Sequence, residues 1–127
     1  MLENFNIQGA KLLIYTRTSS KNEYPDLLAF SAHFAISRDG IHFQALNRNY
    51  GILFATSTVG ADNTIHAKSL KNPWLFRTAD GKFGVAAVRV NADGSEDEES
   101  KGKILLFTSS NLVHFQEIGL VELHTET

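Results

Sequence analysis

Short runs of apolar, aromatic and β-branched residues alternate with polar turn signals along most of the chain, a pattern typical of β-strands. The expected strands are 11–18, 27–37, 41–46, 51–58, 74–77, 83–90, 103–109, 113–118 and 120–123. No segment of ten or more residues keeps the 3.6-residue period that marks an amphipathic helix. The pattern therefore predicts an all-β fold.

The clearest local signal is a β-hairpin around Asp80 and Gly81, a pair typical of two-residue type I′ turns. The segments on either side, 74–77 and 83–90, are rich in aromatic and β-branched residues. Pro73 has no N–H to donate to a sheet, so we expect it to begin the first strand of the hairpin. Asn72 is then expected just outside the sheet edge.

Part of the sequence occurs twice. His42, Phe43 and Gln44 recur 72 residues later as His114, Phe115 and Gln116. The preceding segments also match, 33–37 with 104–109 and, about 71 residues apart, 11–15 with 82–86. A repeat of this length is typical of the four-stranded antiparallel blades of a β-propeller, although two hairpins can also share such residues by chance.

The repeat predicts one all-β unit over 1–127, with blade one at about 11–58 and blade two at about 72–123. Propellers have four to eight blades, so two blades leave strand edges and one blade face uncovered. Three arrangements remain open. The remainder of a longer chain completes the propeller, other copies or subunits complete it, or the chain is a stand-alone β-sandwich.

Composition narrows the classes of function. Hydrophobic residues make up 43% and charged residues 20% of the chain, as in ordinary globular proteins. The net charge of −2 provides no attraction for nucleic acid or an anionic membrane, so we expect neither as a partner. The chain has no cysteine and does not begin with a basic segment followed by an apolar run, which favours a cytoplasmic protein.

Three segments resemble the first blades of glycoside hydrolase family 43. They are Ser-Arg-Asp-Gly-Ile-His-Phe-Gln-Ala-Leu-Asn (37–47), Lys-Asn-Pro-Trp-Leu-Phe-Arg-Thr-Ala-Asp-Gly-Lys-Phe-Gly (71–84) and Leu-Leu-Phe-Thr-Ser-Ser-Asn-Leu-Val-His-Phe (105–115). The resemblance implies an incomplete five-bladed propeller and an oligo- or polysaccharide partner containing arabinose or xylose. Propeller families that act on levans or mannosides share part of these motifs.

The resemblance also implies an inverting hydrolysis by two carboxylates, with a third acid tuning the proton donor. Asn72 stands where family members carry that third acid. The water-activating Asp normally precedes the strand at 11–18, yet 1–10 contains no Asp, and the proton donor belongs to a third blade. We therefore expect the N-terminal part of a glycosidase that is not catalytic by itself. The alternatives are a non-catalytic carbohydrate-binding or assembly module and a structural β-sandwich without a ligand.

Four residues are candidates for sugar binding. Asn72 can hydrogen-bond a sugar hydroxyl or cap a turn. Trp74 can stack on a sugar ring, although a Trp early in a strand is more often in the core, which we favour. Asp62 and His66 lie in the long loop before Asn72, where they can contact a ligand or serve as ordinary turn residues.

The other histidines have structural explanations. His42 and His114 recur in the repeat, so we expect them to pack within the blades, and His33 is expected to be a hydrogen-bonded core or edge residue. No histidine pair has metal-ligand spacing with a carboxylate, so we expect no metal and no cofactor. The acidic run at 96–99 lacks the spacing of a calcium loop and is expected to be a solvated hairpin tip.

Overall fold

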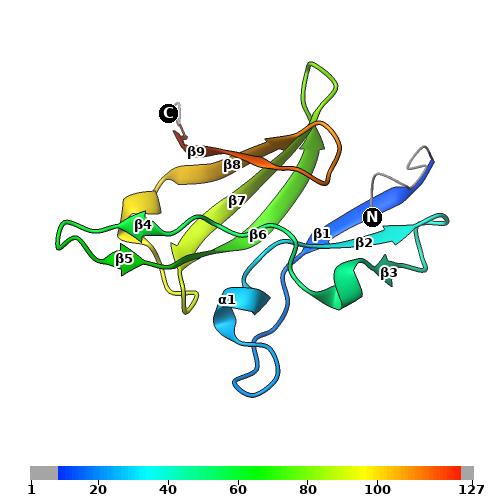
Figure 1. Cartoon of the computed structure of the whole chain (residues 1–127). Coiled ribbons are helices and arrows are strands. Elements are labelled where there is room, and N and C mark those ends of the chain that lie inside the picture. Colours follow the sequence, from blue (N-terminus) through cyan, green and yellow to red (C-terminus); the bar gives the residue numbers. More distant parts are fainter. Residues whose placement is uncertain (1–8, 124–127) are drawn as a thin grey trace.

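The computed structural model describes residues 9–123 and contains three antiparallel sheets, none of them closed, with little helix (Figure 1). The elements are β1 (Lys11–Tyr15), α1 (Asp26–Ala29), β2 (His33–Ser37), β3 (Gln44–Ala45), η2 (Asn47–Asn49), β4 (Thr58–Val59), β5 (Ile65–His66), β6 (Lys68–Arg77), β7 (Phe83–Asn91), η3 (Glu98–Ser100), β8 (Lys103–Ser109) and β9 (Gln116–Glu122). The predicted all-β class is confirmed. Within residues 9–123, neither length nor apolar character equips any helix to cross a membrane.

The first sheet has the order β1-β2-β3, and β2 is buried along its whole length. The predicted strand over 27–37 is wrong in its first half, where α1 forms a single helical turn. Pro25 precedes that turn with a φ of −68°, and its carbonyl accepts the first helical hydrogen bonds, from the N–H groups of Leu28 and Ala29. The strand itself begins at His33.

The second sheet is a four-stranded meander, β6-β7-β8-β9, and it contains the predicted central hairpin. The turn is longer than the expected two residues, because Thr78 and Lys82 still pair through a backbone hydrogen bond of 2.9 Å. The three residues between them end in Gly81, whose φ of 84° suits the left-handed position of a three-residue hairpin loop. The hairpin is therefore confirmed, but its turn type is not.

A β-bulge interrupts β6 at Asn72 and Pro73. Leu70 pairs with Arg89 and Leu75 with Val85, so five steps along β6 match only four along β7. Asn72 adopts a φ of 52°, in the left-handed region that Asn tolerates better than most residues. The expectation that Pro73 begins the strand and leaves Asn72 outside the sheet is wrong, because the bulge takes up both residues within edge strand β6.

The core lies between the first and second sheets. One buried cluster is centred on the second sheet and contains Leu70, Val85, Ala87, Leu105 and Phe107 together with Ala32 and Leu53. The other contains Phe34, Ile36, Leu46 and Leu112. Ile14, Leu75 and Phe115 pack against both clusters, and the rings of Phe34 and Phe115 stack with centroids 6.0 Å apart. The two sheets therefore share one continuous core.

The repeated sequence forms the same turn twice, between β2 and β3 and between β8 and β9. Asp39 Oδ1 accepts hydrogen bonds from the N–H groups of the second and third residues after it, at 2.9 and 2.8 Å. Asn111 Oδ1 makes the equivalent bonds at 2.9 and 2.9 Å. Gly40 and Leu112, which follow these residues, have similar φ values of 78° and 63°. The repeat is therefore structural at these turns.

The two histidines of the repeat do not pack within the sheets as expected. His42 and His114 are both exposed, and the His42 side chain is paired with Asp39 at 2.7 Å. Their backbone N–H groups make the recurring contacts, so the turn explains why this position repeats without requiring the imidazole to be buried.

Replacing Asn111 with Ala should lower the free energy of unfolding by about 1 kcal/mol, because two turn N–H groups lose their acceptor. Urea denaturation checks this result. Asn111→Asp is the matched control, because it installs the residue found at the equivalent position 39 and should be tolerated. Equal destabilisation by both variants would contradict the turn assignment.

Candidate functional site

Trp74 lies on edge strand β6, opposite Ala86, and is 70% exposed. The preference for a core position is therefore wrong, and the bulge explains why. Regular alternation places Leu70 and Trp74 on the same face of the strand, but one extra residue reverses the alternation. Leu75 instead packs into the core, and the indole of Trp74 faces away from it.

Asn72 is also exposed, two residues before Trp74. Its left-handed backbone conformation accounts for an Asn at this position without any ligand. Its amide is uncharged, so it cannot tune the pKa of a neighbouring acid as a carboxylate does. What the bulge supplies is an exposed amide and an exposed indole close together on one strand edge.

Asp62 and His66 belong to the hairpin formed by β4 and β5, which projects from the left of the molecule in Figure 1. Asp62 Oδ1 accepts hydrogen bonds from the hydroxyl and the backbone N–H of Thr64, and these lower the pKa of Asp62 to about 2. The ring of His66 lies 3.0 Å from the same hydroxyl. This is turn chemistry, and it keeps the Asp62 carboxylate ionised at neutral pH.

The four predicted site residues do not form one site. Six residues of extended chain separate His66 from Asn72, a span of roughly 20 Å. Asp62 and His66 form one exposed cluster, while Asn72 and Trp74 lie together at the bulge. The bulge is therefore the better candidate for sugar contact.

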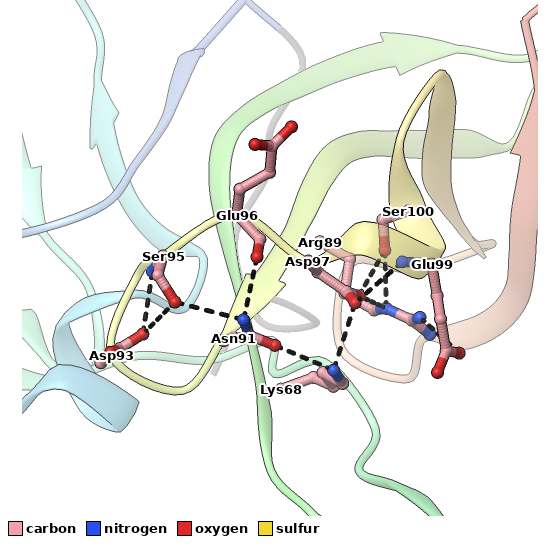
Figure 2. A network of polar contacts seen from close by, with 9 residues as sticks. All are labelled: Lys68, Arg89, Asn91, Asp93, Ser95, Glu96, Asp97, Glu99 and Ser100. Carbon is pink, nitrogen blue, oxygen red and sulfur yellow. Dashed lines mark hydrogen bonds and ion pairs between the residues drawn. The ribbon is translucent and has the colours of Figure 1, made fainter. Parts of the chain in front are cut away.

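A buried polar network lies at the other end of the second sheet (Figure 2). Asp97, only 4% exposed, pairs with Arg89 Nε at 2.8 Å and with Lys68 Nζ at 3.3 Å. The Ser100 hydroxyl donates to the same carboxylate at 2.5 Å, and Lys68 also donates to Asn91 Oδ1 at 3.0 Å. The network joins β6 and β7 to the connection between β7 and β8.

Sequence reasoning missed this network. The run 96–99 was expected to be a solvated tip, which holds for its exposed glutamates but is wrong for Asp97. The available signal was the presence of Arg89 and Lys68 beside buried apolar positions, since buried cations need an acidic partner. Composition alone does not identify which acid of the run supplies it.

The electrostatics make Asp97 a structural residue. Burial by itself raises the pKa of Asp97, but hydrogen bonds from Ser100, Arg89 and Lys68 outweigh it and lower the pKa to about 2. A carboxylate held ionised in this way cannot donate a proton to a leaving group near neutral pH. Arg89 Nη2 is buried without a hydrogen-bond partner, and its nearest carboxylate oxygen is Glu99 Oε2 at 3.7 Å.

His33 is confirmed as a core residue. Its ring lies 2.6 Å from the Tyr24 hydroxyl and 2.9 Å from the Ser31 carbonyl, and burial lowers its pKa. Within the described part of the chain, no three His, Cys, Asp or Glu side chains gather in a way that could hold a metal ion.

No protein-family model matches this chain, and no curated protein or solved structure matches it either. The likeness to family 43 therefore rests on the segments quoted above.

Replacing Asp97 with Asn should destabilise the protein by roughly 3–5 kcal/mol at neutral pH, because Lys68 and Arg89 lose their buried counter-charge. Urea denaturation measures the effect. Glu98→Gln, in the same acidic run but exposed, is the control and should change stability by less than about 0.5 kcal/mol. Equal effects of the two substitutions would show that the network contributes no special stability.

The same pair of variants tests the pH dependence. The pKa of Asp97 is lower in the folded chain than its ordinary 3.8, so its contribution is present above that value and lost as pH falls toward 2. The loss amounts to roughly 2 kcal/mol in the wild type. Asp97→Asn should remove this component of the acid sensitivity, whereas Glu98→Gln should retain it.

Proposed function

We propose that this chain is a carbohydrate-binding unit of the β-propeller type, the N-terminal part of a glycosidase resembling family 43, and that it does not hydrolyse glycosidic bonds by itself. The observation that carries the proposal is the exposed Trp74 at the bulge of an edge strand, within a chain whose two main sheets repeat. The repeat supports the blade architecture, and the indole supports the ligand.

The register supports the assignment of both sheets to one repeating unit. Leu12 pairs with Ile36 in the first sheet, and Gly84 pairs with Thr108 in the second, so both partners are displaced by 72 residues. The offset of about 71 residues read from the segments 11–15 and 82–86 is therefore one residue short. In the corrected alignment, β1 corresponds to β7, β2 to β8 and β3 to β9.

The first blade has three strands among residues 9–123, and β6 of the second blade has no counterpart there. The counterpart predicted from the resemblance, a strand ahead of β1, falls in residues 1–8, outside the described part of the chain. β1 lies next to β6, as neighbouring blades require. These features support two blades of an open ring.

The exposed indole supports sugar binding. Aromatic side chains present a broad apolar face, and a Trp this exposed on a rigid strand is free to stack against a flat ligand surface. Asn72, two residues away, adds an exposed amide that can both donate and accept hydrogen bonds. An apolar platform beside a few polar groups is typical of sites that orient a small polar ligand.

Catalysis by this chain alone is not part of the proposal. Inverting hydrolysis needs one carboxylate to activate water and a second, protonated one on the opposite side of the bond. Asn72 is neutral, and Asp97 is held ionised by two buried cations. The rival proposal of a purely assembling β module predicts no sugar binding at Trp74.

Trp74 is the single tryptophan of the chain, so its fluorescence reports directly on the site. Titration with arabino- and xylo-oligosaccharides should change its emission in a saturable manner. Trp74→Ala should weaken binding at least tenfold by calorimetry, since losing a stacking contact costs on the order of 1.4 kcal/mol or more. Tyr50→Ala, which removes another exposed aromatic ring, is the control. Equal binding by both variants would refute the assignment.

Asn72→Asp restores the acid that the resemblance places at this position. Because the other two carboxylates are still missing, this variant should not hydrolyse aryl-arabinosides or aryl-xylosides above the wild-type background. Release of nitrophenol, with wild type and Asn72→Ala as controls, measures this. Measurable hydrolysis by the Asp variant alone would overturn our account of the missing acids.

A further inference from the structure

The second sheet has an apolar face directed away from the core, which we call the outer face. It comprises Phe76 on β6, Ala86 and Val88 on β7, Ile104 and Leu106 on β8, and Val121 on β9. These residues alternate with, or pair across from, the core residues of the sheet, and among residues 9–123 none of them belongs to either buried cluster. Val121 is 42% exposed.

The repeat identifies the equivalent face of the first sheet. With the offset of 72 residues, Ala86 corresponds to Ile14, which pairs with Phe34, and Leu106 corresponds to Phe34 itself. Phe34 is fully buried, in a cluster that receives Leu75, Phe83 and Phe115 from the second sheet. The face that is uncovered in the second sheet is therefore covered in the first.

The covering surface is also known, because it is the inner face of the second sheet. The contact is head-to-tail, since one face of the first sheet meets the opposite face of the second. Such contacts do not close after two units but leave one face of each type unpaired. A second copy of this chain does not offer the required inner face, because Leu105 and Phe107 are buried in its own core.

The surroundings of the outer face resemble those of an interface. A pocket of about 290 Å³ at one end of the face is lined by Val88, Ile104 and Leu123, and the charged residues Glu96, Lys101 and Lys103 border it. An apolar centre with a charged rim is the composition of protein interfaces. Gly84 and Ala86, on the same face, leave room for bulky partner side chains.

We propose that the outer face of the β6–β9 sheet binds a third antiparallel sheet of this repeat, through a Leu- and Phe-rich face like the one that covers Phe34. This inference rests on the proposed propeller-type unit and names the partner that continues it. Trp74 lies at the β6 edge of the face, outside the area on β7 and β8 that corresponds to the buried area of the first sheet.

The test uses the full chain joined at Thr127, through a Gly/Ser linker, to a second copy of residues 68–123, whose inner face has no first sheet to cover it. The chain has no cysteine, so a single cysteine reports local exposure through its rate of thiol labelling. Val121→Cys places the thiol on the outer face, and Glu98→Cys places it at a side chain that is 79% exposed, away from that face.

The proposal predicts that the joined copy slows labelling of Val121→Cys by roughly tenfold, as expected when nine molecules in ten are covered, without slowing Glu98→Cys. Ile104→Lys in the first copy should restore rapid labelling, because a charge disrupts the apolar contact. Three outcomes would overturn the proposal. They are equal labelling with and without the added copy, an added copy that stays unfolded, and concentration-dependent protection in the 127-residue chain, which would assign the face to a second copy.

The labelling experiment uses no sugar, so its failure is distinguishable from failure of the proposed function. Protection of the outer face without sugar binding would reject the glycan ligand alone. Sugar binding without protection would reject the third sheet alone.

Discussion

One extra residue in β6 determines which side chains of the second sheet face the core. Leu70 and Leu75 both pack inward, although they lie an odd number of residues apart, because the bulge at Asn72 and Pro73 reverses the alternation between them. The conformation depends on an Asn that accepts a φ of 52° and a Pro that has no ladder hydrogen bond to lose. The exposed position of Trp74 follows from this bulge.

Two further devices fasten the ends of the sheets. At one end, the turns after Ser37 and Ser109 use Asp39 and Asn111 to satisfy backbone N–H groups. At the other end, pairing of β7 with β8 stops at Ala87, and the ion pairs of Asp97 hold the remaining part of β7 to the following connection. Polar contacts therefore anchor the regions where the sheet ladder itself ends.

Local patterns predicted the parts of the fold that local chemistry controls. The all-β class, the hairpin before Phe83 and the core position of His33 followed from strand propensity and turn residues. The bulge did not, because Pro73 suits both the start of an edge strand and a bulge. Trp74 was misassigned for the same reason. Asp97 was missed because its partners come from strands distant in the sequence, which composition does not relate.

The most direct test of the account is acrylamide quenching of Trp74 fluorescence in the native and urea-unfolded chain. A bulge that turns the indole outward predicts a native emission maximum typical of solvent-exposed Trp and a quenching constant close to that of the unfolded chain. A blue-shifted native emission with strong protection from acrylamide, in a chain shown to be monomeric at the same concentration, would place Trp74 in the core and contradict the bulge.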